Sequence, residues 1–324
     1  MFNIYKEDLL TKKLNESILK ELNDDNFPLK GSWISTNLPC RDNLEFISKK
    51  SNIPFEFLLS SLDDEEQAHI DLEDESVLIV LDVPYFDEIK NIYLTKPFII
   101  CYNEDYYTTI SKYNKTLIPA TLLKTKGIEL QKHVRLTLNI IYQLSKEFIY
   151  TLKKIDEKTK DIEESMHNSM KNKELFELMD LSKSLVYFAN ALNSNKVVLQ
   201  RLLKSPRYKK FEDDMELMED TEIELNQAIE MCSIYRGILN AMMDANASII
   251  SNNLNNVMKT LTTITIVISI PTLISGIFGM NFDNANSPLY YNKYGFYIVL
   301  GAAFLLSILF AIILLYFTNR RNRR

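Results

Sequence analysis

Two long stretches without a charged residue close the sequence, and they constrain its fold more than any other feature. Residues 260–282 contain no Asp, Glu, Lys or Arg, and residues 294–319 contain none either. A helix of roughly 20 residues spans the core of a bilayer, so each stretch is long enough to cross it. We therefore expect transmembrane helices over 260–282 and 294–318, joined by an outer loop over 283–293.

The charges beside these stretches predict the orientation in the membrane. The tail over 319–324 carries Arg320, Arg321, Arg323 and Arg324. Positive residues next to a span favour the cytoplasmic side, and two crossings return the N-terminal part to the same side. The first residues, MFNIYKEDLLTKK, have charges where a secretory leader needs an apolar core, so we expect no leader. The predicted location is the cell membrane, crossed twice, with both termini in the cytoplasm.

Composition narrows the possible functions. Acidic residues outnumber basic ones by 43 to 37, a balance that suits cations better than nucleic acid. Three scattered cysteines, Cys40, Cys101 and Cys232, form no Cys-x-x-Cys pair, so neither a disulfide framework nor a zinc site is indicated. Because the sequence also has no nucleophile motif or phosphate-binding loop, we expect a protein that is not an enzyme.

Residues 1–127 have the pattern of a cytoplasmic α/β domain. Runs rich in β-branched and aromatic residues over 77–83, 92–101 and 106–110 predict strands. Residues 42–50 and 54–62 predict helices, the second with Pro54 at its start.

Residues 128–259 show helical periodicity instead, with segments from about 128, over 174–203 and from about 213. The last segment carries an apolar seam at spacings of three and four: Leu225, Ala228, Cys232, Tyr235, Leu239 and Met242. The seam fits packing inside the chain or packing around a symmetry axis, where copies of the chain would meet. The predicted fold class is thus an α+β membrane protein with an α/β domain, a long helical stalk and two C-terminal transmembrane helices.

The first span has one face of small and polar residues: Thr262, Thr265, Ser269, Thr272, Gly276 and Gly279. Such a face serves either to pack helices closely or to line a pore. The second span is almost purely aliphatic and aromatic and offers no polar partner stripe, which favours the pore. Two helices cannot enclose a lumen, so a pore requires several copies of the chain around one axis.

The end of the first span, Gly276-Ile277-Phe278-Gly279-Met280-Asn281-Phe282, is similar to the Gly-Met-Asn signature of the CorA family of divalent-cation channels. It follows Pro271-Thr272-Leu273-Ile274 and precedes a short loop and a second span, as in that family. The resemblance implies a funnel-shaped homopentamer in the lipid bilayer. It also implies that the funnel conducts Mg²⁺, with Co²⁺ and Ni²⁺ as further candidate ions.

The resemblance also implies roles for individual residues. Gly279, Met280 and Asn281 resemble the selectivity filter, in which neutral amide oxygens hold the hydration shell of the ion. The implied pore-lining residues are Asn255, Thr265, Ser269 and Thr272. Met258 and Leu261 resemble an apolar gate.

A regulatory Mg²⁺ between subunits is implied as well. Asp220 resembles its acidic ligand on the long helix, but the partner position falls near Ser60, with Asp63 and Asp64 a few residues later. This departure from the family pattern predicts weakened or rearranged Mg²⁺ sensing.

The sequence is also compatible with two other functions. A Zn²⁺ transporter similar to ZntB would share the signature and topology, although the absence of His and Cys along the proposed pore favours a hard, hydrated ion. A membrane-anchored coiled-coil scaffold would explain the spans but not the polar face or Asn281.

Overall fold

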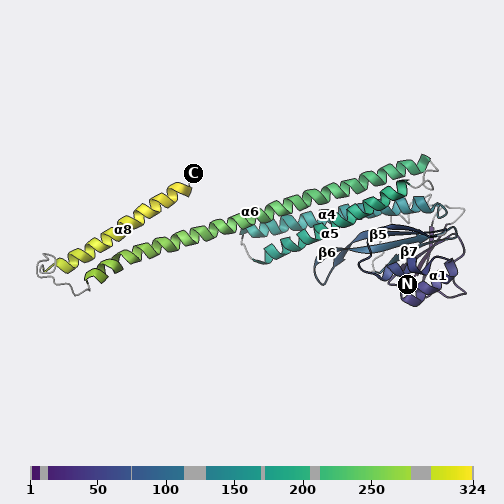
Figure 1. Ribbon diagram of the computed structural model, residues 1–324, viewed down its shortest axis with the longest axis horizontal. Coiled ribbons are helices and arrows are strands. Elements are labelled where there is room, and N and C mark those ends of the chain that lie inside the picture. Colours follow the sequence, from purple (N-terminus) through teal and green to yellow (C-terminus); the bar gives the residue numbers. More distant parts are fainter. Residues whose placement is uncertain are drawn as a thin grey trace. The chain divides into compact units, whose positions relative to one another are not determined.

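The computed structural model describes residues 2–7, 14–73, 75–112, 129–168, 172–204, 212–278 and 293–322 (Figure 1). It divides into two compact units, Met1–Met243 and Asp244–Arg324. Helix α6, Glu212–Phe278, contributes to both.

The first unit contains a seven-stranded sheet in the order β2-β1-β3-β7-β6-β5-β4. Neighbouring strands are antiparallel except β3 and β7, which are parallel. The strands are β1 Phe2–Glu7, β2 Leu14–Leu19, β3 Ser32–Asn37, β4 Ile70–Glu73, β5 Ser76–Asp87, β6 Ile92–Tyr102 and β7 Tyr106–Ser111. The three predicted strands correspond to β5, β6 and β7 and are confirmed, whereas the sequence patterns did not indicate β1 to β4.

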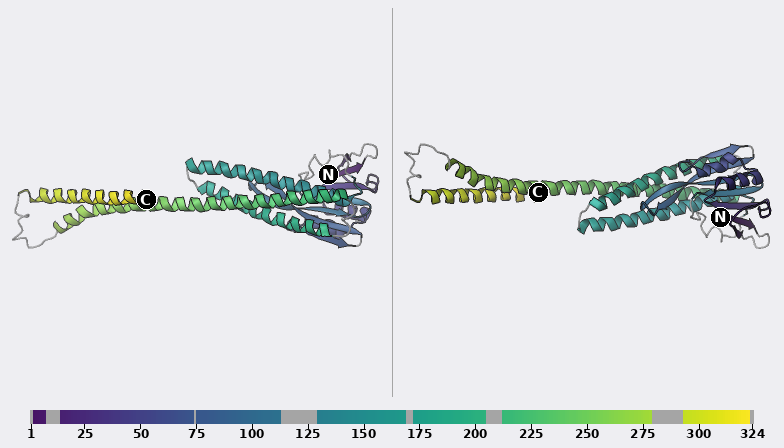
Figure 2. Two further views of the ribbon diagram at one scale, coloured as in Figure 1. Left: turned by 90° about the horizontal axis from the view of Figure 1, so that it is seen from above. Right: turned by 90° about the horizontal axis from the view of Figure 1, so that it is seen from below.

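Helices cover both faces of this sheet. Helices α1 (Arg41–Ser51) and α2 (Phe55–Leu59), followed by the short helix η1 (Ser60–Leu62), pack on one face. The long helices α4 (His133–Asn168), α5 (Asn172–Lys204) and the first part of α6 lie side by side on the other (Figures 1 and 2). Strand β5 contributes Val77, Ile79 and Leu81 to the long-helix side and Leu78 and Val80 to the α1 side. Burial on both faces explains why β5 reads as a continuous apolar run.

One side chain caps the edge of β5 beyond the first residue of β4. Val80 exchanges both backbone hydrogen bonds with His69, and Asp82, two residues on, presents its backbone groups to the same edge. There the amide of Asn195 on α5 accepts from the Asp82 N–H at 2.9 Å and donates to the Asp82 carbonyl at 2.7 Å. The amide therefore satisfies the backbone groups that a neighbouring strand would otherwise pair.

The apolar seam of α6 belongs to the core of the first unit. Four of its six residues are at most 2% exposed: Leu225, Ala228, Cys232 and Leu239. Tyr235 and Met242 pack against the same core, and the Cys232 thiol donates to the Leu185 carbonyl of α5 at 3.4 Å. Of the two alternatives for this seam, packing inside the chain is the one that the structure shows.

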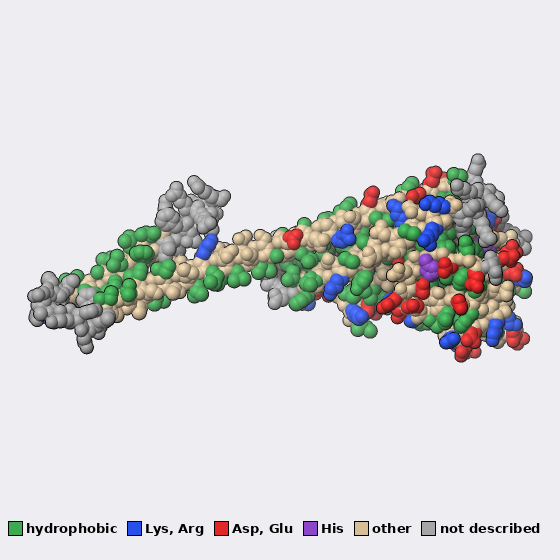
Figure 3. Space-filling model, in the orientation of Figure 1, with side chains coloured by type: hydrophobic (Ala, Val, Ile, Leu, Met, Phe, Trp, Pro, Cys, Tyr) green, Lys and Arg blue, Asp and Glu red, His purple; other side chains and the backbone are tan. Residues whose placement is uncertain are grey.

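The second unit consists of the remainder of α6 and of α8, Gly295–Asn322. Within 244–277, which the structure describes throughout, Asn246 is the one buried residue. In the described part of the chain α6 is the helix long and apolar enough to cross a bilayer, and none of that apolar stretch is buried. The described apolar segment of α8, Tyr297–Ile313, is shorter. Hydrophobic side chains accordingly lie along distal α6, while most charged side chains gather on the first unit (Figure 3).

Candidate functional site

One face of distal α6 carries the residues predicted to line and gate a pore. Because α6 is helical throughout this region, successive positions turn by 100°, and the following residues fall within about 120° of its circumference. They are Asn255, Met258, Leu261, Thr265, Ser269, Thr272 and Gly276. Each is exposed in the single chain, Met258 by 54% and Leu261 by 56%. The structure thus brings these predicted residues onto one uncovered stripe.

The hydroxyl groups on this stripe have a defined orientation. Thr265 donates to the Leu261 carbonyl at 2.8 Å, and Thr272 donates to the Ile268 carbonyl at 2.8 Å. Ser269 donates to the Thr265 carbonyl at 2.7 Å. A hydroxyl has a single hydrogen, so once that hydrogen is bound to the backbone, only oxygen lone pairs face outward. The stripe therefore presents hydrogen-bond acceptors.

Pro271 lies on the opposite side of the same helix. A proline inside a helix removes the bond to the carbonyl four residues earlier and bends the helix there. The predicted filter residues Gly279, Met280 and Asn281 lie outside the described residues.

The residues predicted to bind a regulatory ion lie on two separate elements of the first unit. Asp220 is exposed on α6, whereas Asp63 follows η1 and its carboxylate accepts from the Glu65 N–H at 2.9 Å. Ser60, at the partner position, donates its hydroxyl to the Glu56 carbonyl at 3.4 Å. Among the described residues no group of three or more His, Cys, Asp or Glu side chains is arranged to hold a metal ion. Within one chain the structure does not bring Asp63, Asp64 and Asp220 together.

Asp64 pairs with a lysine, and the charge of Asp220 influences a second lysine; the sequence patterns identified neither lysine. The Lys112 ammonium lies 2.9 Å from the Asp64 carboxylate and also donates to the Leu62 carbonyl at 2.9 Å. On α4, Lys146 lies over the ring of Tyr142, 4.2 Å from its centroid. The hydrogen bond to Tyr142 raises the pKa of Lys146, and the negative charges of Glu224 and Asp220 raise it further.

A pocket of about 450 Å³ extends from Asp64 to α5. Asp82 lines it together with amide and hydroxyl side chains, among them Thr95, Asn190 and Asn193. Burial raises the pKa of Asp82 to about 6. No cationic side chain of the described residues pairs with this carboxylate. An acidic residue inside the apolar run of β5 is the sequence signal that could have revealed it.

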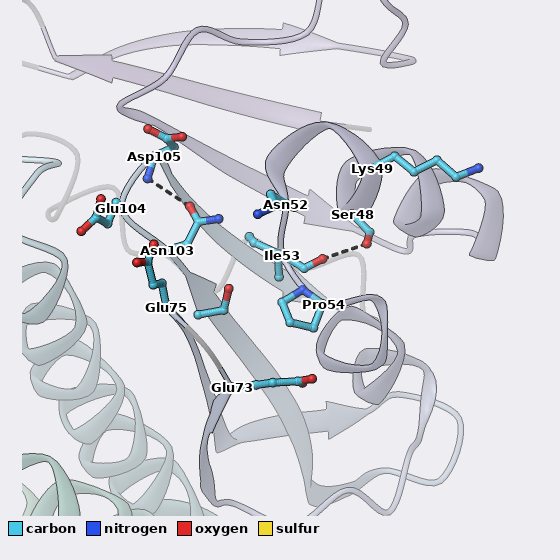
Figure 4. Close-up of a pocket in the computed structure, with 11 residues that line it drawn as sticks. Ser48, Lys49, Asn52, Ile53, Pro54, Glu73, Glu75, Asn103, Glu104 and Asp105 are labelled. Atoms are coloured by element: carbon cyan, nitrogen blue, oxygen red, sulfur yellow. Dashed lines mark hydrogen bonds between the residues drawn. The ribbon is translucent and has the colours of Figure 1, made fainter.

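A second pocket, of about 820 Å³, lies where α1 ends beside two strand turns (Figure 4). The Asn103 amide organises its wall, because it donates to the Ser51 carbonyl at 2.7 Å and accepts from the Asp105 N–H at 3.0 Å. Glu73, Glu75 and Glu104 line the pocket, but in Figure 4 their carboxylates do not converge on one point. We assign no ligand to it.

Comparison with known proteins identifies the family. Residues 30–321 match the family described as "CorA-like Mg2+ transporter protein". The chain belongs to this family. Because CorA-like proteins are ion transporters, membership confirms the prediction that the chain is not an enzyme.

Relatives of known structure agree with this assignment. The cobalt/magnesium transport protein CorA of Methanocaldococcus jannaschii is 27% identical over 289 residues, which cover 87% of this chain and 89% of that protein. The complete structure of the CorA magnesium transporter from the same organism superimposes with a TM-score of 0.79 at 25% identity. It covers 99% of this chain and 98% of that one, so the predicted fold class is confirmed.

The ZntB cytoplasmic domain from Vibrio parahaemolyticus shares the fold of the first part of the chain. Its TM-score is 0.57 at 14% identity, over 76% of this chain and 97% of that domain. At 14% identity this comparison shows a shared fold and carries no conclusion about function.

Proposed function

We propose that five copies of this CorA-family chain form a channel that conducts Mg²⁺ into the cytoplasm across the cell membrane, with Co²⁺ and Ni²⁺ as further candidate ions. Residues 260–282 line the pore, residues 294–318 face lipid, and residues 283–293 form the outer loop. Both termini lie in the cytoplasm. The names of the relatives, which are magnesium and cobalt transport proteins, support the choice of ion.

The stripe on distal α6 is the observation that carries this proposal. Its polar residues are exposed in a helix apolar enough for a membrane, and hydrocarbon does not solvate hydroxyl or amide groups. Polar side chains inside a membrane normally face a bundle interior or a water-filled cavity. A ring of five such helices would supply that cavity, because one stripe from each copy faces the common axis.

The chemistry of the stripe suits a hydrated cation. Mg²⁺ gives up its waters reluctantly, and those waters direct their hydrogens away from the ion. Thr265, Ser269 and Thr272 offer oxygen lone pairs, because their hydrogens are bound to backbone carbonyls. Asn255 adds an amide ring at the inner end. Acceptors without full negative charge hold the water shell and still release the ion.

Selection and gating are assigned to the two ends of this pore. Gly279, Met280 and Asn281 form the outer filter, where the Asn281 amide oxygens receive hydrogen bonds from the water shell. Met258 and Leu261 form the gate, because bulky apolar rings block a hydrated ion by dewetting. Asp220, with Asp63 and Asp64 of a neighbouring copy, holds the regulatory Mg²⁺.

Replacement of Asn281 by alanine tests the central proposal. In liposomes containing the purified protein, we expect Asn281→Ala to reduce Mg²⁺ uptake to the background of empty liposomes, while the oligomer keeps its mass in solution. Asn286→Ala, the same substitution in the outer loop, is the matched control and should keep wild-type uptake. Undiminished Mg²⁺ flux through assembled Asn281→Ala channels would refute the filter.

The same liposomes separate the ion alternatives. Uptake of Zn²⁺ without Mg²⁺ would favour the ZntB-like alternative. No flux of any divalent cation would favour the scaffold.

A further inference from the structure

One face of α8 is covered by another part of the chain. Ala303 is 6% exposed and Ser307 is 5% exposed, whereas Ala302, one position before Ala303, is exposed. Positions four residues apart lie on one face of a helix, so Ala303 and Ser307 point the same way. Because Ala302 and Ala303 are the same residue type on the same helix, the difference in burial comes from a neighbour outside α8.

Distal α6 has a matching face. Among the described residues, it is the other helix of the unit that contains α8. Its half-buried residues recur at helical spacing and are Thr263, Ile266, Val267, Ile270, Pro271 and Ile274. The other residues from Leu261 to Ile277 are exposed. The two covered faces therefore belong to one contact, between α8 and the α6 helix of the same chain.

This contact lies behind the polar stripe. At 100° per residue, the centre of the half-buried face lies about 150° from the centre of the stripe that holds Thr265, Ser269 and Thr272. The covered face and the proposed pore wall are thus on nearly opposite sides of one helix. Pro271 belongs to the covered face, so the contact includes the point where proline bends α6.

The covered face of α8 carries small side chains. Alanine and serine let two membrane helices approach closely, whereas Phe304 and Leu305 on the other faces of α8 are bulky and exposed. The Ser307 hydroxyl donates to the Ala303 carbonyl of its own helix at 2.9 Å, so its hydrogen needs no partner on α6. The contact therefore depends on the size of these residues rather than on their polarity.

We propose that Ala303 and Ser307 are positioning residues, which seat α8 on the α6 helix of the same chain and thereby fix the rotation of the pore helix. This inference rests on the proposed channel function. A helix with one face seated against a partner cannot turn about its own axis without breaking that contact. The stripe opposite the contact is therefore held toward the lumen. Separation of the two helices would free α6 to turn apolar side chains, such as Ile270, into the lumen.

Two adjacent reporter cysteines test this rotation in the full-length protein in liposomes. Ser269 lies on the stripe and Ile270 on the covered face, at nearly the same depth along α6. Each is replaced by cysteine in a Cys40→Ser background, because Cys40 is exposed whereas Cys101 and Cys232 are buried. The probe is 2-aminoethyl methanethiosulfonate, a small cation, supplied on both sides of the membrane. It reacts with thiolates in water, so Ser269→Cys should react at least about tenfold faster than Ile270→Cys.

Bulky substitutions in the contact should remove this difference. Ala303→Leu and Ser307→Leu force the two helices apart, and the two reaction rates should then agree within about threefold. Mg²⁺ uptake should fall in the same variants, because apolar side chains enter the lumen. Ala302→Leu adds the same side chain on an exposed face and is the matched control, which should keep the rate difference and the uptake. Ser307→Ala should keep both as well, because it preserves the small size.

A cross-linking experiment tests the partner helix without a bulky substitution. Ile270→Cys and Ala303→Cys are combined in one chain in the Cys40→Ser background, and the channels are treated with a bifunctional methanethiosulfonate. Linkage within one chain consumes both thiols and leaves a denatured chain of monomer mass, whereas linkage between copies gives dimers. We expect monomers with both thiols consumed.

Several outcomes would overturn the inference. They are cross-linked dimers, an undiminished rate difference in assembled Ala303→Leu and Ser307→Leu channels, and an equal loss of that difference in Ala302→Leu. If the leucine variants do not assemble, the cross-link and Ser307→Ala decide. Failure of the channel itself looks different, because equal rates at the two reporter cysteines beside an unaltered α8, together with no Mg²⁺ uptake by the wild type, would count against the pore.

Discussion

The two parts of α6 differ sharply in what surrounds them, although they belong to one helix. From Leu225 to Leu239 one face is buried against α4 and α5, whereas between Asp244 and Ile277 most residues are exposed and only Asn246 is buried. The first part finds its packing partners inside its own chain. The second part has exposed apolar residues that need lipid or other copies. A single helix can therefore depend on two different solvents for its stability.

The largest effect we expect comes from testing this difference with matched truncations. Leu225→Ala removes a side chain that is 2% exposed, and such cavities cost about 2–5 kcal/mol. Leu254→Ala makes the same change where the side chain is 60% exposed. Thermal unfolding of detergent-dispersed monomers should show a large loss for the first variant and almost none for the second. Equal losses would mean that distal α6 also packs within its chain.

The next effect concerns Leu261, on the exposed part of the helix. Leu261→Asn should hydrate the proposed apolar ring and raise resting Mg²⁺ flux at least about tenfold, which corresponds to about 1.4 kcal/mol of barrier. Leu261→Val keeps an apolar ring and should keep the barrier. If assembled channels of both variants retain wild-type resting flux, the gate lies elsewhere on α6.

The smallest effect lies within the well-packed unit and shows that burial there is not uniformly favourable. Asp82 has a pKa of about 6 in the folded chain against 3.8 for an ordinary aspartate, because burial disfavours its charge. The stability that depends on a protonated Asp82 is therefore fully present below pH 3.8 and is lost as the pH rises through about 6. At pH 7 this loss is at most about 3 kcal/mol, and solvent near the carboxylate reduces it to about 1 kcal/mol.

Asp82→Asn should recover that loss at pH 7 while it makes little difference near pH 4. Melting temperatures of the variant and the wild type, measured across this pH range, would show it. A variant that is less stable than wild type at pH 7 would mean that a bound cation, or a contact outside the described residues, compensates the charge.

Sequence patterns predicted the helices and strands that are buried on one face or on both faces. β5 was recognised because both of its faces are apolar, and the helices because their periodicity is sustained. β3 was missed because this interior strand buries polar residues, among them Ser35 and Thr36, and so lacks an apolar run. β2 was missed because it is an exposed edge strand, where little burial selects its residues.

Some residues of the candidate site could likewise be predicted from the sequence, and others could not. The stripe on α6 could be predicted because helical spacing alone places its residues on one face. The pairing of Asp64 with Lys112 could not, because Asp64 follows η1 and Lys112 follows β7, and only tertiary folding brings the two charges together. Lys146 and Tyr142 stand at helical spacing and could have been paired from sequence, but the influence of the Asp220 charge on Lys146 depends on how α4 packs against α6.

The amide of Asn195 has a consequence for assembly. An unpaired strand edge is a template on which another chain can add a strand, and such addition leads to aggregation. Chains gathered at high local concentration in one membrane would meet this hazard continually. By occupying both backbone groups of Asp82, Asn195 denies this stretch of β5 to a foreign strand, so an added strand cannot continue the pairing of β4 along β5 at this residue.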